Sequence, residues 1–339
     1  MPLDVPRAPP TIIAGHDRPP PLRHWGVIAA GAAAAVLGGL AVAAELRALR
    51  AEKRHPPEGR FITVDGVQLH YLERGSGRPV VLLHGMCSML QDFTSSIVDE
   101  LARGYRVIAF DRPGYGYSER PRGRFWTPTR QARLIHMAAT RLGVEKPILV
   151  AHSWGTLVAL AYALLYPHQT AAIVLLGGYV FPVRRPDLAM SGVFRLPLLG
   201  ALLRHTLAPL AVRLMAPRLL HDVIFAPNPV PARFAREFPL AFNERPAQLR
   251  AIAEEALMLR FAAAALSRRY REVAVPTVIL AGESDRVVDP HRQAIPLHRA
   301  IRHSAIRLMP RTGHMVHQVH PQAVYDAIET ARQQVETAS

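Results

Sequence analysis

A short apolar run that ends in a serine is the feature that most limits what this chain can fold into. Residues 148–152, Ile-Leu-Val-Ala-His, have the length and composition of a buried strand, and the apolar sequence from Gly155 onward is typical of a helix. Ser153 lies between them, with the small residues Ala151 and Gly155 two positions away on either side. Only small flanking residues let a strand and a helix approach closely at so sharp a turn, so the segment predicts a strained strand–turn–helix unit.

A serine in such a turn is a candidate nucleophile. The turn lifts its Oγ clear of the sheet and aims the free N–H groups of the following helix, beginning with Trp154, at the place where a substrate oxyanion would form. The pattern departs from the strict Gly-x-Ser-x-Gly form, because Ala151 replaces the first glycine. A serine here can also act only as a helix cap, so the turn by itself leaves both interpretations open.

Two later segments supply an acid and a histidine in the order that such a nucleophile requires. Asp285 follows a strand-like run, and an acid just beyond a strand end can orient an imidazole and stabilise its charge. His314 follows a second such run, on a loop that can reach across the edge of the sheet. The chain order Ser153, Asp285, His314 predicts nucleophile, acid and base. Asp289 and Glu283 remain alternatives for the acid.

At this point the chain resembles the α/β-hydrolase fold superfamily, over roughly residues 60–335. Residues 80–86, Val-Val-Leu-Leu-His-Gly-Met, look like the family's strand that ends in His-Gly. Residues 111–118, Asp-Arg-Pro-Gly-Tyr-Gly-Tyr-Ser, look like the family's loop after the following strand. The resemblance therefore rests on several separate motifs at consistent spacing.

The resemblance also implies roles for individual residues. In that family pattern Ser153 attacks a carbonyl, His314 takes and returns its proton, and Asp285 holds His314. The backbone N–H groups of Met86 and Trp154 would bind the oxyanion.

The rest of the sequence alternates strand and helix patterns, which predicts an α/β fold with a doubly wound, mostly parallel central sheet. We expect the α/β-hydrolase core over residues 60–182 and 273–335, with an opening hairpin around Asp65-Gly66 and a helix over residues 93–102. Residues 183–272 lose the alternation and become helical and punctuated by proline, which matches in position the family's inserted helical cap. A cap of this kind supplies apolar walls and excludes water from the site.

The N-terminal part of the chain predicts a membrane helix. Residues 1–22 are rich in proline and lack periodicity, which predicts a disordered leader. Residues 25–44 form a stretch of twenty residues without a charge, long enough to cross a bilayer. We therefore assign residues 23–45 to an N-terminal transmembrane helix and residues 46–59 to a linker. A cleavable signal with an Ala-x-Ala site at residues 41–43 is the alternative.

We accordingly expect a membrane-anchored, single-pass protein of a bacterial inner membrane. Arg47, Arg50, Lys53 and Arg54 follow the span, and by the positive-inside rule they would keep the enzyme on the cytoplasmic side. Display outside the inner membrane is an equally common use of such an anchor, so the side stays open.

The positive charge of the chain does not indicate nucleic-acid binding. The formal net charge is +15, yet the sequence has no contiguous basic run with interleaved aromatic residues and no helix-turn-helix, zinc or RNA-binding pattern. Residues 183–275 contain fourteen arginines against seven acidic residues. An anionic lipid or an anionic substrate is therefore the better-supported partner.

No metal or cofactor is expected from the sequence. His314, His317 and His320 are spaced by three, but no neighbouring carboxylate or cysteine completes a ligand set. The turn at residues 114–116, Gly-Tyr-Gly, lacks the remainder of a dinucleotide-binding loop. Cys87 is the single cysteine, and we interpret it as a small buried residue beside the site rather than as a nucleophile.

A serine nucleophile favours acyl transfer, since family members that open epoxides or displace halide use aspartate at the same turn. Our first hypothesis is a serine hydrolase that cleaves a carboxylic ester of a small hydrophobic acyl substrate through an acyl-enzyme. Hydrolysis of a carbon–carbon bond in a diketone-like ring-cleavage product uses the same residues and is the alternative. A catalytically inactive, anchored binding protein is a hypothesis of another class, and the complete set Ser153, Asp285 and His314 argues against it.

Overall fold

The chain forms two units, residues 1–39 and residues 40–339, which are described separately. A computed structural model describes residues 22–184 and 190–338. In the first unit the described residues belong to helix α1 (Leu22–Arg54), and residues 1–21 of the predicted leader lie outside the described range. The part of α1 from Trp25 onward is long and apolar enough to cross a membrane. The helix continues without a break to Arg54, so most of the predicted linker is helical.

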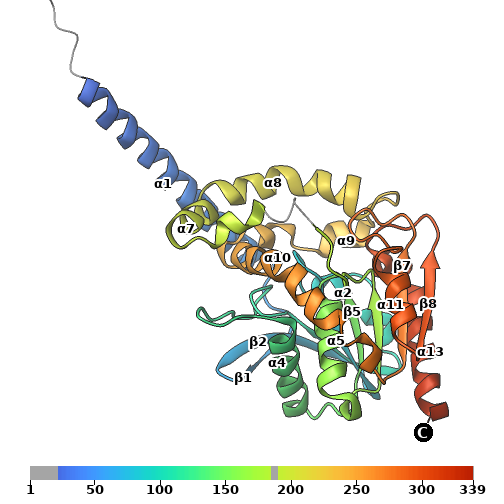
Figure 1. Ribbon diagram of the computed structural model, residues 1–339. Coiled ribbons are helices and arrows are strands. Elements are labelled where there is room, and N and C mark those ends of the chain that lie inside the picture. Colours follow the sequence, from blue (N-terminus) through green and yellow to red (C-terminus); the bar gives the residue numbers. More distant parts are fainter. Residues whose placement is uncertain (1–21, 185–189, 339) are drawn as a thin grey trace, which may run out of the picture. The chain divides into compact units, whose positions relative to one another are not determined.

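The second unit is built on one eight-stranded mixed sheet (Figure 1). Its strand order is β1-β2-β4-β3-β5-β6-β7-β8. The first two strands run antiparallel to their neighbours, and the other contacts are parallel. The strands are β1 (Arg60–Val64), β2 (Val67–Arg74), β3 (Arg78–Leu83), β4 (Tyr105–Phe110), β5 (Ile148–His152), β6 (Ala172–Leu176), β7 (Thr277–Gly282) and β8 (Ser304–Met309).

The predicted opening hairpin joins β1 and β2. Its two turn residues, Asp65 and Gly66, have φ angles of 49° and 66°. A two-residue hairpin turn of this kind needs a positive φ at both positions, and Asp-Gly accepts it readily. The doubly wound sheet expected from the sequence is confirmed, with its antiparallel part confined to this end.

Alternate residues of the central strands pack on opposite faces of the sheet, as the period of a strand requires. Val81, Leu83 and Leu149 belong to one buried cluster, together with residues of α4 (Pro128–Arg141) and α5 (Gly155–Leu165). The neighbouring residues Val80, Leu82 and Ile148 belong to a second cluster, with residues of α3 (Val98–Leu101) and α13 (Pro321–Ala338). Both faces of the sheet are therefore covered and buried, which explains the continuous Val, Ile and Leu runs in the central strands.

One expected helix is divided into two. The sequence predicts a single helix over residues 93–102, but the chain forms two short helices, α2 (Gln91–Thr94) and α3. The residues between them form turns, in which the N–H groups of Ser96 and Ile97 both donate to Phe93 O. The sequence pattern therefore missed the break between the two helices.

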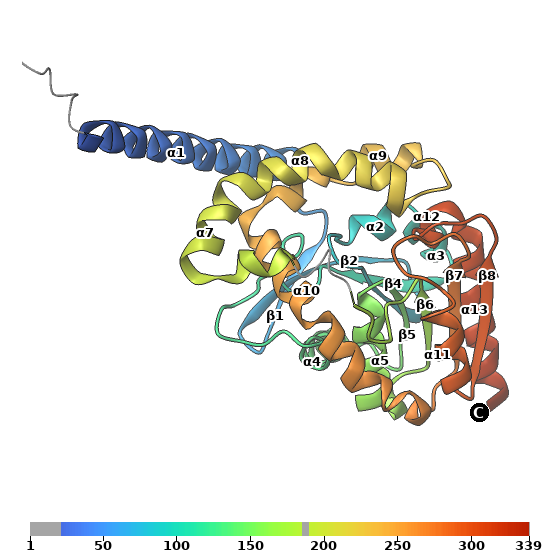
Figure 2. The same cartoon turned by 45° about the horizontal axis from the view of Figure 1, so that its top comes forward.

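Between β6 and β7 the described residues are helical, and we call residues 190–272 the cap. Figure 2 shows α8 on the outer side of the cap, and both views place α10 between α7 and α5. The remaining helices of the second unit are α11 (Ala294–Ala300) and α12 (Val316–Val319). The cap elements are η2 (Met190–Arg195), α7 (Pro197–His205), α8 (Leu207–Leu219), the π-helical segment η3 (Leu220–Ile224), α9 (Ala232–Glu237), η4 (Leu240–Glu244), α10 (Pro246–Ser267) and η5 (Tyr270–Glu272).

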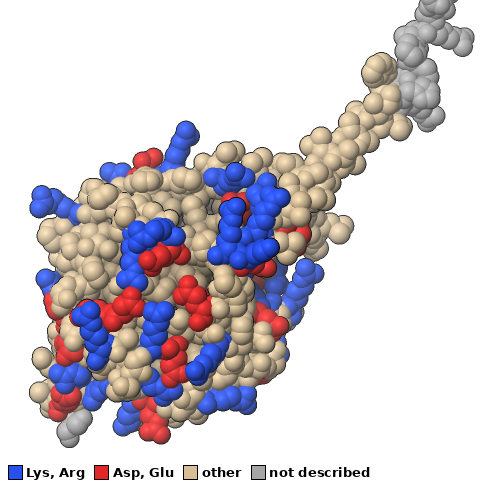
Figure 3. All heavy atoms as spheres, turned by 180° about the vertical axis from the view of Figure 1, so that it is seen from behind, with Lys and Arg blue, Asp and Glu red and all other residues tan. Residues whose placement is uncertain are grey.

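Basic side chains are not gathered into one patch on the face of the second unit seen in Figure 3. Lysine and arginine alternate there with aspartate and glutamate. A nucleic-acid footprint needs basic residues clustered on one face or along one helix, and this face has no such cluster among the described residues.

Candidate active site

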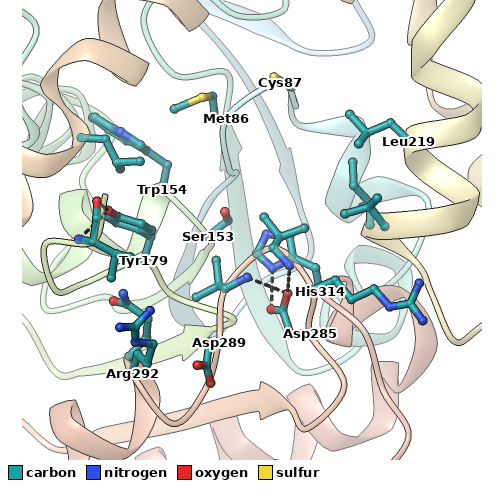
Figure 4. Close-up of a pocket in the computed structure, with 18 residues that line it drawn as sticks. Met86, Cys87, Ser153, Trp154, Tyr179, Leu219, Asp285, Asp289, Arg292 and His314 are labelled. Carbon is teal, nitrogen blue, oxygen red and sulfur yellow. Dashed lines mark hydrogen bonds and ion pairs between the residues drawn. The ribbon is translucent and has the colours of Figure 1, made fainter. Parts of the chain in front are cut away.

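The residues singled out from the sequence follow the carboxyl ends of parallel strands, where ligands of open α/β sheets bind. Met86 lies just beyond β3, and Ser153 immediately follows β5. Asp285 lies beyond β7, and His314 beyond β8. All of these, with Trp154, line one cavity of about 600 Å³ (Figure 4). The topology thus brings together residues that are far apart in the sequence.

The serine turn has the strained geometry that the sequence predicts. Ser153 has a φ angle of 51°, a left-handed conformation that costs energy for a residue with a side chain. Its N–H is held by Leu176 O at 2.9 Å. A Cβ atom on Gly155 would lie 2.5 Å from Leu83 O, so glycine is required for α5 to approach β3 this closely. Ala151 is fully buried in its strand, so the missing first glycine does not prevent the turn.

The acid beside the histidine is Asp285. Its Oδ2 lies 2.7 Å from His314 Nδ1, and its Oδ1 accepts the backbone N–H groups of Val287 and Val288 at 2.8 Å each. The alternatives Asp289 and Glu283 are exposed, and neither contacts the imidazole. Of the three candidates, only Asp285 is both buried and within hydrogen-bond distance of His314.

The cap holds the loop that carries the histidine. His314 N–H donates to Ile224 O at 3.1 Å, and Gly313 N–H donates to Asn228 Oδ1 at 3.1 Å. Asn228 Nδ2 in turn donates to Arg311 O at 3.1 Å. A side chain on Gly313 would collide with Ala226 O. Sequence reasoning missed Asn228, because nothing in the sequence links a cap asparagine to a loop more than eighty residues later.

The backbone N–H groups of Met86 and Trp154 are among those at the cavity that have no acceptor in the part of the chain that the structure describes. They are the two donors that the family resemblance names for the oxyanion. Trp154 is the first residue after the serine and precedes α5. A buried N–H that lacks an acceptor is costly, and a substrate oxygen would satisfy it.

The peptide group that carries the Met86 N–H is fixed from its other side, because its carbonyl is Gly85 O. Arg112 donates to Gly85 O from Nη2 at 2.8 Å and to His84 O from Nε at 2.7 Å. His84 Nε2 accepts the Arg112 backbone N–H at 2.9 Å, so its Nδ1 carries the proton and donates to Gly85 O at 2.8 Å. Burial lowers the pKa of His84 to about 4, which keeps this imidazole neutral.

Arg112 is itself held by the cap. Its guanidinium makes two hydrogen bonds to Glu255 of α10, at 2.7 and 3.1 Å, and both side chains are fully buried. It also lies 4.6 Å from the centre of the Trp154 ring. Burial by itself would raise the pKa of Glu255, but the attraction of Arg112 and Arg120 and the hydrogen bonds from Arg112 and Gln131 together keep that pKa below its usual value. Arg112 lies in the segment that the sequence marked only as a loop, and an arginine in such a loop gave no signal of this role.

The cavity walls are mostly apolar and come from both the core and the cap. Leu219, Val223, Ile224 and Leu259 contribute from the cap. Figure 4 shows the polar residues Asp289 and Arg292 on the opposite side of Ser153 from Met86. The site can therefore hold an apolar group beside a few charged side chains.

The interpretation of Cys87 as a buried residue is wrong. Its side chain is exposed toward the cavity that it lines, and its backbone has a left-handed φ of 57°. Desolvation within the cavity, together with the charge of Glu255, raises the pKa of the thiol to about 12. A thiol with so high a pKa is a poor nucleophile at neutral pH, in agreement with the non-catalytic interpretation.

The three histidines spaced by three do not converge. His317 Nε2 lies 2.8 Å from Asp92 Oδ1, and His320 Nε2 lies 2.8 Å from Thr312 Oγ1. The sequence gave no carboxylate for these histidines, but the fold brings Asp92 of α2 beside His317 and His152. These three are metal-ligand types within 4.8 Å of one another, yet the hydrogen bond from His317 already occupies Asp92.

His152, next to the serine, is a buried hydrogen-bonded residue. Its Nε2 lies 3.2 Å from His314 O and its ring centre 4.7 Å from that of His314. Burial, with the nearby His317, lowers the pKa of His152 to about 4. Since His152 stays neutral at pH 7, it donates to the His314 carbonyl without placing a charge behind the imidazole.

Comparison with known proteins identifies a family. A family model described as alpha/beta hydrolase fold matches residues 78–321. The 2-hydroxy-6-oxo-2,4-heptadienoate hydrolase of Pseudomonas putida is 26% identical over 266 residues, which cover 76% of this chain and 90% of that protein. A membrane phospholipase A described as a bacterial virulence factor superposes with a TM-score of 0.65 at 23% identity, covering 93% of this chain and 97% of its own. An esterase from Thermogutta terrifontis superposes with a TM-score of 0.60 at 22% identity, covering 82% and 99%.

Proposed function

This chain belongs to the α/β hydrolase fold family and is a hydrolase, and from that premise we propose that it cleaves carboxylic esters of hydrophobic substrates through an acyl-enzyme. The observation that carries the proposal is one arrangement: a serine in a left-handed turn faces the same apolar cavity as an imidazole bonded to a buried carboxylate. A serine nucleophile, a base and an orienting acid are the minimum set for this chemistry.

In the first half of the reaction, Ser153 Oγ attacks the ester carbonyl while His314 Nε2 removes its proton. Asp285 accepts the Nδ1–H at 2.7 Å, which leaves Nε2 free as the base and stabilises the imidazolium that forms. The imidazolium then gives its proton to the departing alcohol. In the second half, His314 activates a water molecule that hydrolyses the acyl-serine, and the enzyme returns to its starting state.

The negative charge that develops on the carbonyl oxygen is assigned to the N–H groups of Met86 and Trp154. Both are unpaired in the described chain and border the cavity beside Ser153. Fixed donors of this kind act most strongly where water is excluded, because they need no reorganisation during the reaction. The hydrogen bonds from Arg112 and His84 to Gly85 O are what hold the Met86 donor in place.

A fluorophosphonate probe tests the nucleophile directly. We expect it to label the purified full chain and to fail on Ser153→Ala. If the wild-type protein is not labelled although it is folded, the inactive binding-protein hypothesis is favoured instead.

A panel of p-nitrophenyl esters of graded acyl length tests the substrate class. We expect the highest kcat/KM for medium or longer acyl chains, because the cavity walls are mostly apolar and each buried methylene favours binding by about 0.8 kcal/mol. Turnover that falls steadily with chain length would refute the hydrophobic acyl assignment while leaving ester hydrolysis intact.

Hydrolysis of a carbon–carbon bond is the second candidate, and two observations favour it. The relative from Pseudomonas putida is named for a dienoate hydrolase activity and matches over most of its length. The guanidinium groups of Arg286 and Arg292 at the cavity would suit the carboxylate of such a product. Activity on a dienone-diketone with none on any ester would replace the first proposal by this one.

We also propose that α1 anchors the chain in a membrane, consistent with a bacterial inner membrane. The support is the length of the helix and its uncharged sequence from residue 25 to residue 44. A signal sequence near the N-terminus would share these properties, so the N-terminus of the mature protein, read by mass spectrometry, decides between an anchor and a cleaved signal.

A further inference from the structure

The cap carries an unusual concentration of exposed apolar side chains. Nine of the sixteen large apolar side chains that are exposed in the described part of residues 40–339 lie within residues 196–219. The most exposed of them are Leu198 at 88%, Met215 at 67% and Leu214 at 66%. Soluble surfaces seldom gather so many, and a contiguous group usually marks an interaction site. The nine are Leu196, Leu198, Leu199, Leu202, Leu207, Leu210, Leu214, Met215 and Leu219.

These side chains all lie on α7, on α8 or directly before α7, and together we call them the α7–α8 face. Leu207, Leu210 and Leu214 recur at intervals of three and four, so they lie on one side of α8. Helices α7 and α8 meet at an angle of 55°, and the pair is apolar enough by composition to enter a membrane. Figure 2 shows α8 along the outer edge of the cap, away from the sheet.

The charged side chains carried by α7 and α8 themselves are all basic. No aspartate or glutamate occurs between residues 188 and 221. Arg213 and Arg218 are exposed on α8, on turns that also carry exposed Leu214 and Met215. Apolar side chains with flanking arginines match a surface of apolar chains beneath anionic headgroups, and they match an acidic protein or a nucleic acid poorly.

The face also continues into the cavity. Leu219 is 48% exposed on the outer surface and at the same time lines the cavity that contains Ser153. Val223 and Ile224, one turn further along, line the cavity wall. A molecule that leaves a lipid surface at the end of α8 would therefore meet apolar contacts all the way to the serine.

The end of α1 is fastened to the cap. Arg47 lies 3.5 Å from Glu244, and Glu52 lies 3.0 Å from Arg245, which begins the cap helix α10. Only about 5 Å of helix separates Ala44, the last uncharged residue of the predicted span, from Arg47. The segment that directly follows the predicted span is therefore bound to the cap.

We propose that the α7–α8 face docks onto the surface of an anionic phospholipid bilayer and receives the hydrophobic substrate from it. The proposal rests on the proposed anchoring by α1 for its orientation, and it deepens the proposed function by making the substrate a membrane-borne ester. The leucines and Met215 enter the upper acyl region, while Arg213 and Arg218 bind headgroup phosphates.

A depth probe on the full chain tests the docking without any catalytic readout. Met215→Cys carries an environment-sensitive fluorophore, and the protein is reconstituted in vesicles of phosphatidylglycerol and phosphatidylcholine. Met137→Cys is the matched control, because Met137 is also an exposed methionine on a helix, but on α4 of the core. Wild-type protein treated with the same fluorophore measures the background signal from Cys87, the single native cysteine.

We expect brominated phosphatidylcholine to quench the probe at residue 215 and to leave the probe at residue 137 almost unchanged. Equal quenching at both positions, or none at 215 in protein that floats with the vesicles, overturns the docking. Protein that does not float overturns the anchor and the docking together. If, without lipid, the probe at residue 215 becomes more shielded from water as the protein concentration rises, the face binds a second copy of the chain instead.

A second variant tests the link to the substrate. The double change Leu198→Glu and Leu214→Glu places charges in the face at positions that do not line the cavity. Hydrolysis of an ester embedded in vesicles should fall by about tenfold or more, as expected when apolar membrane contacts are replaced by charges. Hydrolysis of a soluble short-chain ester should not change. An equal loss on both substrates, or on neither, contradicts the proposal, whereas inactivity of the wild-type protein on both contradicts the proposed function alone.

Discussion

The buried ion pair between Arg112 and Glu255 gives the sharpest test of how the cap supports the site. Glu255→Gln removes the negative charge and keeps the size of the side chain. In the native protein Glu255 accepts hydrogen bonds from Arg112, from Tyr115 Oη at 2.7 Å and from Gln131 Nε2 at 3.0 Å. A glutamine amide would turn an NH₂ group toward one of these donors, and Arg112 would lose its buried counter-charge.

Two effects follow, with different magnitudes. Removing one partner of a fully buried pair costs about 3–5 kcal/mol of the free energy of unfolding, because the remaining charge is left uncompensated. Arg112 also orients the peptide group between Gly85 and Met86, so its displacement should misplace one oxyanion donor. Loss of a whole donor costs about 10²–10³ in kcat, so a displaced one should cost about tenfold to a hundredfold, with KM nearly unchanged.

The assay combines urea unfolding with kcat and KM on one p-nitrophenyl ester, well below the unfolding temperature. Glu254→Gln is the matched control, since Glu254 is the preceding residue and its pair with Arg120 at 2.7 Å is partly exposed on the carboxylate side. We expect the control to lose less than about 1 kcal/mol and to keep wild-type kcat. A Glu255→Gln protein that is destabilised but retains full kcat would refute the positioning role and leave only a structural one.

The pH dependence of the same pair has a defined sign. Burial opposes the charged form of Glu255, but Arg112, Arg120 and the hydrogen bonds to the carboxylate together lower its pKa from the ordinary value of 4.5. The stabilisation is therefore complete above that ordinary value and is lost as the pH falls through the lower pKa of the folded state. The difference in unfolding free energy between wild type and Glu255→Gln should be largest at neutral pH and shrink on strong acidification.

Three further predictions concern the remaining site residues. Asp285→Asn should lower kcat by about 10³–10⁴, whereas Asp289→Asn should leave it within a few-fold, and the reverse result in steady-state kinetics would move the acid to Asp289. Cys87 should resist iodoacetamide at pH 7 and react faster as the pH rises toward 10, because only the thiolate reacts and desolvation raises the pKa of the thiol to about 12. Mass spectrometry measures the alkylation, and rapid alkylation at pH 7 would contradict this prediction. Gly313→Ala should destabilise the fold by more than about 1 kcal/mol and lower kcat, because its Cβ would collide with Ala226 O; unchanged thermal unfolding and kcat would show that the loop can move away freely.

The sequence predicted the parts of this fold that depend on local pattern. The alternation of apolar runs with helical patterns predicted the parallel sheet. Asp65-Gly66 predicted the hairpin, because the conformation of a tight turn depends on two adjacent residues. The serine turn was predictable for the same reason, since small flanking residues report a close approach of strand and helix. Asp285 was favoured on its place after a strand, and its contact with His314 now separates it from Asp289.

The parts that the sequence did not predict are contacts between distant segments. Glu255 reaches Arg112 across 143 residues, and Asp92 reaches His317 across 225. Neither pair has a periodicity or spacing that a single sequence reveals. The exposure of Cys87 was missed for a related reason, because the cavity that it lines is assembled from segments distant in the sequence.

The contacts of the cap limit how it can open. Ile224 O and Asn228 hold the histidine loop, and Glu255 of α10 holds Arg112 behind the oxyanion peptide. Lifting the whole cap would break all of these bonds and dismantle the site at the moment of substrate entry. The bonds come from the end of η3, the following loop and α10, so α7 and the first turns of α8 are the part of the cap that can move while the site stays assembled. That part carries Leu198, Leu202, Leu207 and Leu210 of the α7–α8 face, so its movement on a bilayer leaves Ser153, His314 and the oxyanion donors in place.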